Sequence, residues 1–367
     1  MRLLIDAHCF DYGTSEGINT YLSGLYRELV KIATDIDFFF VAHDIDKIRV
    51  IFGEFQNTHY VPLTATNRIY RLLFEFPKII RQYKIDAAHY QYISPLIKNC
   101  KNIITLHDIL FKDYPKMFPL RYRIVKGILF KLSALRSDML LTVSQYSKDR
   151  IAYHYGIPKD KIFVTPNAVS DDFFNIDAKV AHQFIQNKGI EKYLLYVSRI
   201  EPRKNQVILL QAFHELELYK QGYDLVFIGR RTLPTPEFDH LLYSLNETEL
   251  KHIHIFNQVD YEELRFWYKA ASLFVYPALA EGFGIPPIEA GAAEIPCICS
   301  NKTAMSDFSF FENNLIDISD LECLKETIIS NLMFLPGTKS ISQQIHEKYN
   351  WSTIAKDFYM KIQSPGM

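Results

Sequence analysis

Short apolar runs typical of β-strands alternate with helical segments in two successive rounds along this 367-residue chain. Between the rounds, residues 166–190 are mostly polar and interrupt the alternation. Repeated strand–helix alternation predicts a parallel sheet with helices on both faces, so each round predicts one doubly wound α/β domain. The strand-like runs are residues 3–7, 38–42, 102–106, 139–143 and 162–165 in the first round, and 193–197, 225–228, 254–256, 273–276 and 297–299 in the second.

Helical periodicity and capping residues place helices between these runs. Apolar residues recur at helical spacing from Ile18 and again from Leu209. Ser144 is a good N-cap for a helix over residues 148–155. The length of the chain, which exceeds the usual size of a single hydrophobic core, also favours two domains.

Charge is distributed unevenly between the two halves. Residues 1–170 carry 23 Lys and Arg against 16 Asp and Glu, a net charge of +7, whereas the remainder carries 18 against 26, a net charge of −8. A basic half predicts an anionic partner, which could be a phospholipid surface, a lipid-phosphate acceptor or nucleic acid. No signal-peptide pattern and no run of 18 apolar residues occurs, and the five cysteines are scattered. We therefore expect a cytoplasmic protein with reduced thiols.

The segment 281–290 has the most informative local pattern. It follows a strand-like run, contains two glycines within three residues, and leads through prolines into a small-residue helix predicted over residues 288–293. Helix N-termini bind phosphates, and carboxylates accept hydrogen bonds from sugar hydroxyls, so the pattern indicates a nucleotide sugar. The segment reads Glu281-Gly282-Phe283-Gly284-Ile285-Pro286-Pro287-Ile288-Glu289-Ala290.

This segment resembles the E-x7-E signature of retaining glycosyltransferases of the GT-B architecture, family 4 in particular. The resemblance implies that Glu281 contacts the donor sugar and Glu289 the ribose. It implies donor contacts from the intervening Gly282, Phe283, Gly284 and Ile285 as well. It also implies two Rossmann-like domains that face across a cleft.

The resemblance extends over nearly the whole chain and assigns its parts. Residues 1–168 would form the acceptor-binding domain and residues 169–347 the nucleotide-sugar-binding domain. Residues 348–367, which begin near Tyr349-Asn350-Trp351, would form a helix that crosses back to the first domain.

The loop at residues 198–205 follows the first strand of the second round. Ligands of doubly wound sheets bind beyond the carboxyl ends of the strands. Arg199 and Lys204 on this loop match the family's spacing for two cations that stabilise the leaving diphosphate, a role that makes them catalytic candidates. The adjacent Arg203 leaves open which cation matters.

Other site residues follow from the resemblance. His107, which ends a strand, would contact the donor sugar near the reacting centre, with Asp108 as its orienting partner. Gly17 lies in a glycine-containing stretch, residues 13–19, that would approach the diphosphate. Val259 would contact the base, while Asn19 and Asp108 are expected on the acceptor side.

Two D-x-D patterns, at residues 35–37 and 44–46, are typical of metal-dependent glycosyltransferases. Both flank a predicted strand, which favours solvated loop ends. We expect no metal and no cofactor, because the basic loop would supply the charge.

Residues 112–150 carry nine Lys or Arg and three Asp, and Phe118, Tyr122, Val125, Leu129 and Leu132 recur among them at roughly helical spacing. Residues 68–84 form a second basic stretch. An amphipathic helix on an anionic membrane fits this pattern, and so does a helix with its apolar face in the core. The first alternative predicts peripheral attachment at the inner face of the membrane.

Together these features predict a retaining hexosyltransferase that uses a nucleoside diphosphate sugar and a saccharide or lipid-linked acceptor in surface polysaccharide synthesis. The resemblance of residues 201–205 to mannosyltransferases favours GDP-mannose as the donor. A UDP-hexose transferase, a GT-B sugar-nucleotide epimerase and a non-catalytic nucleotide-sugar binding protein stay open. No nucleic-acid recognition motif is present.

Overall fold

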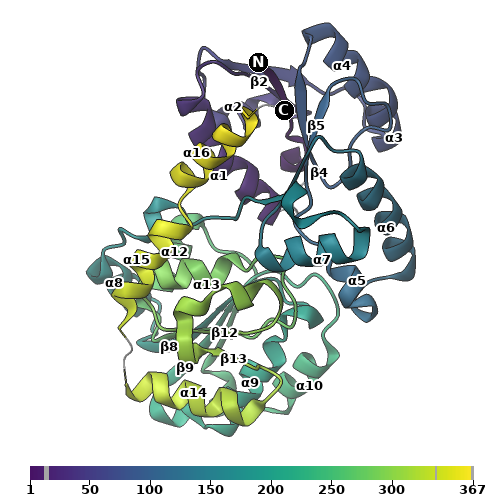
Figure 1. Ribbon diagram of the computed structural model, residues 1–367. Helices are drawn as coiled ribbons and strands as arrows, with labels where there is room; N and C mark the ends of the chain where they lie inside the picture. Colours follow the sequence, from purple (N-terminus) through teal and green to yellow (C-terminus); the bar gives the residue numbers. More distant parts are fainter. Residues whose placement is uncertain (12–15, 335–336, 365–367) are drawn as a thin grey trace. The chain divides into compact units, whose positions relative to one another are not determined.

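The computed structural model describes residues 1–11, 16–334 and 337–364. The chain divides into two compact units (Figure 1). Unit 1 comprises Met1–Ala168 and Trp351–Met367, and unit 2 comprises Val169–Asn350. The corresponding domain ends predicted from sequence are residues 168 and 347.

Unit 1 contains a seven-stranded sheet in the order β3-β2-β1-β4-β5-β6-β7. Every pairing is parallel, for example Leu4 with Phe39 and Ile5 with His89. The order reverses between β1 and β4, so this is a doubly wound sheet. Its strands are β1 (Arg2–Asp6), β2 (Asp37–Ala42), β3 (Thr58–Pro62), β4 (Ala87–Gln91), β5 (Lys101–Thr105), β6 (Met139–Thr142) and β7 (Ile162–Val164).

The helices of unit 1 connect these strands, and one comes from the far end of the chain. The α-helices are α1 (Glu16–Ile32), α2 (Ile45–Phe52), α3 (Arg68–Tyr70), α4 (Phe76–Tyr83), α5 (Leu110–Asp113), α6 (Leu120–Leu135), α7 (Gln145–Tyr155) and α16 (Trp351–Ile362). The shorter turns are η1 (His8–Asp11), η2 (Arg71–Glu75), η3 (Pro115–Met117) and η4 (Lys159–Lys161).

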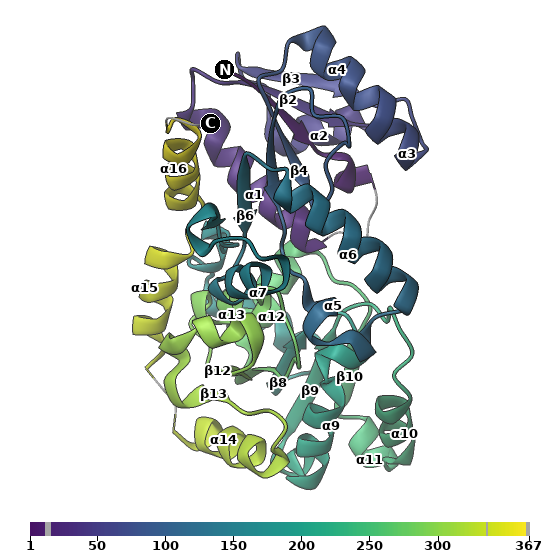
Figure 2. The same ribbon diagram turned by 45° about the vertical axis from the view of Figure 1, so that its right-hand side comes forward.

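Helix α16 packs along α1, as both views show (Figures 1 and 2). A Cβ atom on Gly24 would lie 2.0 Å from the Trp351 ring, so only glycine lets the indole rest on α1. The same ring meets Tyr21 at 6.4 Å between centroids. This contact fixes the C-terminal helix in unit 1.

Residues 68–83 form one helical segment with a π-turn in its middle. The N–H of Phe76 donates to the carbonyl of Arg71, five residues earlier, in η2. Pro77 explains why the helix widens into a π-turn here, because the proline ring would clash with the carbonyl of Leu73 in a regular α-helix. Such π-turns are rare and often occur at functional sites.

Unit 2 repeats the doubly wound plan with a six-stranded parallel sheet in the order β10-β9-β8-β11-β12-β13. Strands β8 and β11 are neighbours, so the loops that follow them lie together at the carboxyl edge. The strands are β8 (Lys192–Val197), β9 (Tyr223–Ile228), β10 (Ile253–Phe256), β11 (Leu273–Tyr276), β12 (Cys297–Ser300) and β13 (Leu315–Ile316).

Helices cover this second sheet. The α-helices are α8 (Ala178–Gln186), α9 (Gln206–Glu215), α10 (Pro236–Ser244), α11 (Glu247–Leu250), α12 (Tyr261–Ala270), α13 (Ile285–Ala292), α14 (Leu321–Met333) and α15 (Thr338–Lys348). The 3-10 turns are η5 (Asp171–Phe173), η6 (Pro202–Lys204), η7 (Leu218–Gln221), η8 (Thr303–Asp307) and η9 (Ser309–Asn314).

The predicted fold class, α/β with two doubly wound sheets, is confirmed, and each predicted strand overlaps an observed one. Ser144 caps α7 by accepting from the N–H of Ser147 at 3.0 Å, as expected. Strands β3, β4 and β13 had not been predicted. Helix α13 begins at Ile285 rather than at residue 288.

The predicted apolar stripe of residues 118–132 is neither uniformly buried nor uniformly exposed, since Tyr122, Val125 and Leu132 are exposed. Phe118 precedes α6, and both it and Leu129 pack against the core. The most exposed apolar residues of α6 are instead Leu120, Ile124 and Ile128. Among the residues that the structure describes, no helix combines the length and apolar character needed to cross a bilayer.

Candidate functional site

Two loops meet at the carboxyl edge of the unit 2 sheet. The β8 loop runs from Ser198 to Asn205, and the β11 loop leads from Pro277 to α13. The N–H of Leu279 donates to the carbonyl of Arg203 at 2.9 Å, which fixes one loop against the other. This is the edge at which doubly wound sheets bind their ligands.

A buried charge cluster joins these loops around Glu281. Its Oε1 atom is in contact with Lys204 Nζ, lies 3.1 Å from Arg203 NH1, and accepts from the Tyr276 hydroxyl at 3.1 Å. Lys204 Nζ also donates to the Tyr276 oxygen at 2.9 Å. The backbone N–H of Glu281 donates to Thr303 Oγ1 at 2.9 Å. The carboxylate is thus held in place from three sides.

Both charges of this cluster are almost fully buried, with 8% of Glu281 and 6% of Lys204 exposed. Burial would raise the pKa of Glu281, but the positive charges of Arg203 and Lys204 outweigh it and lower the pKa to about 2. Burial lowers the pKa of Lys204 against the attraction of Glu281. Glu281 therefore stays ionised near neutral pH, as a hydrogen-bond acceptor for hydroxyl groups.

Glu201 organises the other cations of the β8 loop. Its Oε1 atom accepts from Arg203 NH2 at 2.8 Å and lies 3.8 Å from Arg199 NH2, while Oε2 accepts from Thr232 at 3.2 Å. The side chain of Arg199 is 40% exposed. Arg199 is therefore the loosely held cation of the loop, and Arg203 and Lys204 are the fixed ones.

Two glycines at this edge of the sheet have positive φ angles, which other residues rarely adopt. Gly229 follows β9 with φ of 150°, and a Cβ atom there would lie 1.9 Å from the carbonyl oxygen of Ser198. Gly284 has φ of 102° and is the N-cap of α13. Both positions need glycine, because an L side chain would clash or be strained.

Helix α13 presents an N-terminus beside Glu281. Pro286 and Pro287 occupy its first turn, so those two positions offer no N–H group. The side chain of Phe283 is buried against Phe308 and Tyr349, each 5.6 Å away between centroids. Phe283 can therefore reach a ligand only through its backbone.

Glu289 lies one helical turn further, in α13, and is not part of the Glu281 cluster. Its Oε2 atom accepts from the Tyr268 hydroxyl of α12 at 2.9 Å. Burial raises the pKa of Glu289 to about 7. Val259 lies between β10 and α12, at the same edge of the sheet.

The remaining candidates lie in unit 1. His107 follows β5 and shares a hydrogen bond of 2.7 Å between its Nε2 and Gln91 Oε1. Burial lowers its pKa to about 3, so the ring is neutral. Asp108 accepts from the N–H of Leu110 at 3.1 Å and lies 3.5 Å from the Tyr92 hydroxyl. The hydrogen bond with Gln91 therefore orients His107.

Gly17 and Asn19 lie in the first turn of α1. Gly17 is exposed, whereas Asn19 Oδ1 is buried with no hydrogen-bond partner in the described part of the chain. The stretch just before Gly17, residues 12–15, lies outside the described residues.

The aspartates of the D-x-D patterns have structural partners. Asp35 accepts from Tyr359 and from Gln363, both in the C-terminal segment, at 2.5 and 2.6 Å. Asp44 caps α2 by accepting from the N–H of Lys47 at 3.0 Å. Within residues 1–11, 16–334 and 337–364, no group of three or more His, Cys, Asp or Glu is arranged to hold a metal ion.

Two members of the Glu281 cluster, Tyr276 and Thr303, were not predicted from sequence, and Arg203 was weighed only as a substitute. A tyrosine within a strand and a threonine shortly after a strand carry no motif. The usable signal was position, since Tyr276 ends the strand that leads into the Glu281 loop.

Stability should fall as the pH rises from 4.5 to about 7, and Glu289 should cause the fall. The unfolded carboxyl ionises near 4.5 while the buried one keeps its proton to about 7. That shift corresponds to on the order of 3 kcal/mol. Glu289→Gln should remove the dependence, whereas Glu326→Gln, at an exposed position of α14, should keep it. Urea unfolding of the three proteins below pH 4.5 and above pH 7 measures the difference; parallel curves for wild type and Glu289→Gln would refute the assignment.

Two family models match the chain. The model described as Glycosyltransferase Family 4 matches residues 15–173, and that of Glycosyl transferases group 1 matches residues 178–329. The O-antigen chain mannosyltransferase RfbU of Salmonella typhimurium is 34% identical over 262 residues, which cover 71% of this chain and 68% of that protein. The O-antigen chain mannosyltransferase B of Escherichia coli is 26% identical over 347 residues, 87% and 89% of the two chains.

Among solved structures, the sucrose-phosphate synthase of Thermosynechococcus elongatus is similar with a TM-score of 0.76 at 18% identity, covering 99% of this chain and 98% of that one. This likeness concerns the fold. The family resemblance inferred from residues 281–290 is confirmed by the sequence relatives and the family models. The chain belongs to glycosyltransferase family 4 and is a glycosyltransferase.

Proposed function

We propose that the protein transfers mannose from a nucleoside diphosphate mannose, with GDP-mannose as the donor, to a saccharide or lipid-linked acceptor in surface polysaccharide synthesis. The observation that carries the proposal is the buried cluster of Glu281, Lys204 and Arg203 at the carboxyl edge of unit 2. The mannosyltransferase names of the two relatives support the choice of sugar.

The cluster offers one partner for each part of such a donor. Lys204 uses two of its three N–H groups on Glu281 and Tyr276, which leaves one for a phosphate oxygen. Arg199, loosely held, supplies a planar fork that suits a phosphate. Glu281 accepts from the sugar hydroxyls, and Glu289 from the ribose hydroxyls. Arg199 and Lys204, the two cations predicted from sequence, thus both bind the diphosphate in this proposal. Arg203 instead positions Glu281.

The reaction breaks the bond between the anomeric carbon and the diphosphate oxygen and forms one to an acceptor hydroxyl oxygen. The acceptor proton passes to the leaving phosphate on the same face of the sugar, so the configuration is retained. Negative charge grows on the diphosphate during this step, and fixed cations lower the barrier by stabilising it. Neutral His107 in unit 1 acts as a hydrogen-bond partner of a sugar hydroxyl and carries no charge.

Replacing Lys204 should reduce transfer far more than it reduces stability. A charge-assisted hydrogen bond contributes roughly 1.5–3 kcal/mol, so Lys204→Met should lower kcat/KM for GDP-mannose by roughly 10- to 150-fold. Arg203 remains to pair with Glu281, which keeps the fold. Lys251→Met, at an exposed position of unit 2, is the matched control.

Transfer is measured with GDP-mannose and, in parallel, with UDP-hexoses. Equal rates for Lys204→Met and Lys251→Met would exclude Lys204 from the donor site. Turnover with a UDP-hexose and none with GDP-mannose would replace the mannosyl proposal by the alternative donor.

Transfer should also proceed without a divalent metal ion. The cations Arg199 and Lys204 supply the positive charge that a metal supplies in a D-x-D enzyme. We expect the rate in EDTA to equal the rate in added Mg²⁺ or Mn²⁺. A rate that EDTA abolishes and Mn²⁺ restores would contradict this expectation and direct attention to Asp35, Asp37, Asp44 and Asp46.

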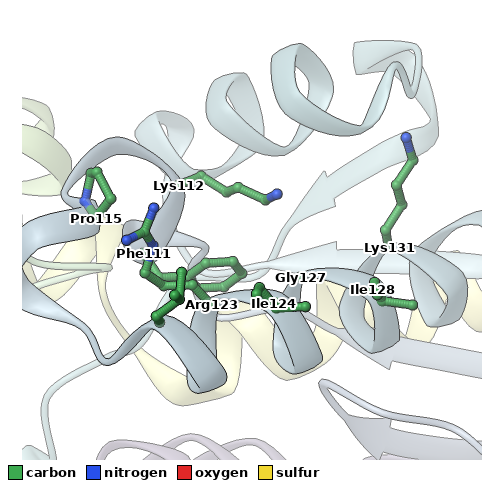
Figure 3. Close-up of a pocket in the computed structure, with 9 residues that line it drawn as sticks. Phe111, Lys112, Pro115, Arg123, Ile124, Gly127, Ile128 and Lys131 are labelled. Atoms are coloured by element: carbon green, nitrogen blue, oxygen red, sulfur yellow. The ribbon is translucent and has the colours of Figure 1, made fainter.

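Unit 1 has a surface suited to an anionic membrane. Leu120, Ile124 and Ile128 of α6 are each more than half exposed. They line a hollow of about 410 Å³ together with Lys112, Arg123 and Lys131, whose side chains surround the apolar ones (Figure 3). Apolar residues framed by cations are typical of membrane-surface helices. We propose that this hollow rests on anionic lipid, where a lipid-linked acceptor would be found.

The double variant Ile124→Ser with Ile128→Ser should lose most of its binding to anionic vesicles. Wild-type binding should weaken as salt screens the basic residues. The matched control, Met333→Ser with Phe334→Ser, removes two apolar residues of unit 2 that are even more exposed and should bind like wild type. Vesicle flotation at low and high salt measures this. Wild-type recovery equal on neutral and anionic vesicles would contradict the proposal.

A further inference from the structure

Arg71 is a buried cation at the carboxyl edge of the unit 1 sheet. It begins the π-turn η2, nine residues after the end of β3, and is only 3% exposed. Its Nε atom has no hydrogen-bond partner among the residues that the structure describes. Long basic side chains are rarely buried this deeply without an anion beside them.

Asp6 lies within electrostatic reach of Arg71, whose charge helps to lower the pKa of that carboxyl, but Asp6 and Glu75 both hydrogen-bond to other groups. Asp6, at the end of β1, contacts His8 Nδ1 at 2.5 Å. Glu75, one turn along from Arg71, accepts from the N–H and the hydroxyl of Thr64 at 2.6 and 2.7 Å and from the N–H of Ala65 at 3.2 Å. Within the described residues, Arg71 makes no ion pair within 4.0 Å.

A buried guanidinium without a direct ion pair destabilises a fold, because it loses its hydration and gains no hydrogen-bonded anion in exchange. A helical turn that places Arg71 there, at the edge where doubly wound sheets bind ligands, therefore indicates an anionic ligand. The π-turn itself matters, since it sets the direction in which residue 71 projects from the helix.

Two further cations surround the position. Arg68 lies in the preceding turn, and burial together with the charge of Arg71 lowers its pKa although part of it is exposed. Lys126 of α6 has its pKa lowered by burial and by Arg68. Arg68 is thus close enough to Arg71 on one side and to Lys126 on the other for their charges to repel, and an anion bound there would relieve the repulsion.

Aromatic and apolar groups adjoin these cations. Lys126 Nζ lies 5.9 and 5.8 Å from the rings of Tyr122 and Phe130, and Phe130 stacks on Tyr92 at 4.6 Å. Beside Arg68 and Arg71, the helical segment exposes Ile69, Tyr70 and Phe74 by more than half. The ligand that this surface fits is an anionic group joined to an apolar chain.

We propose that Arg71, Arg68 and Lys126 bind a phosphate group of the acceptor, and that Ile69, Tyr70 and Phe74 contact the lipid chain to which it is joined. This inference rests on the proposed function, since it specifies the acceptor of the transfer as a phosphorylated lipid carrier. A sugar phosphate offers the same anionic group without the chain, so the two sources differ in their use of the apolar residues.

The test is calorimetric binding of farnesyl diphosphate, inorganic pyrophosphate and mannose 6-phosphate to the full chain without donor. Arg71→Gln should weaken binding of farnesyl diphosphate at least tenfold, and Arg71→Lys should retain part of it, because the charge remains without the fork. Lys78→Gln, at an exposed position of the same helical segment, is the matched control. Arg71→Gln should bind GDP like wild type, which separates this site from the donor site.

Stability gives a second readout that a purely structural arginine would not give. Without ligand, Arg71→Gln should unfold at the same or a higher temperature than wild type, because it removes a buried charge that makes no direct ion pair. Wild-type affinity for farnesyl diphosphate in Arg71→Gln would overturn the proposal. If Arg71→Gln fails to fold, Arg68→Gln decides, and unchanged affinity there overturns it as well.

Tighter binding of farnesyl diphosphate than of pyrophosphate identifies the lipid carrier, and tighter binding of mannose 6-phosphate identifies a soluble acceptor. Absence of GDP-mannose binding would refute the proposed function, and the Arg71 measurements, made without donor, would be unaffected.

Discussion

The pairing of the Glu281 carboxylate with Lys204 and Arg203 determines the organisation of unit 2. A buried carboxylate without partners would be neutral or would destabilise the fold, and the charges of Arg203 and Lys204 keep this one ionised. They can reach it only because β8 and β11 are adjacent strands and their loops leave the sheet at the same edge. The glycine at 229 lets the backbone of one neighbouring strand approach the β8 loop. Topology, loop geometry and charge are therefore parts of one arrangement.

Much of the fold could be predicted from sequence, because parallel strands buried on both faces read as continuous apolar runs. The strands that escaped are those without that signature. Residues 87–91 of β4 are buried but contain alanine, histidine and glutamine, and β3 lies at the sheet edge with mostly half-exposed residues. Helix α13 starts early because prolines suit a first turn, which periodicity does not detect.

The candidate site, like the fold, could be predicted from sequence only in part. Glu281 and Lys204, which carry a recognisable spacing, lie in one cluster, whereas Arg199 is placed on Glu201 instead. Partners such as Tyr276 could not be read from the chain, since the contact depends on the pairing of β8 with β11. The burial of Arg71 could not be predicted from sequence either, because a basic stretch normally lies in solvent. Its position depends on a π-turn that Pro77 imposes and on two acids that bind elsewhere.

The central claim is that Lys204 binds the diphosphate of the donor. Calorimetry with GDP and GMP, each titrated into wild type and Lys204→Met, tests it most directly, because the two nucleotides differ by one phosphate and the two proteins by one charge. The account predicts that the preference of wild type for GDP falls at least tenfold in Lys204→Met, so that the two changes are strongly coupled. An unchanged preference for GDP, with both nucleotides weakened alike or not at all, would contradict it.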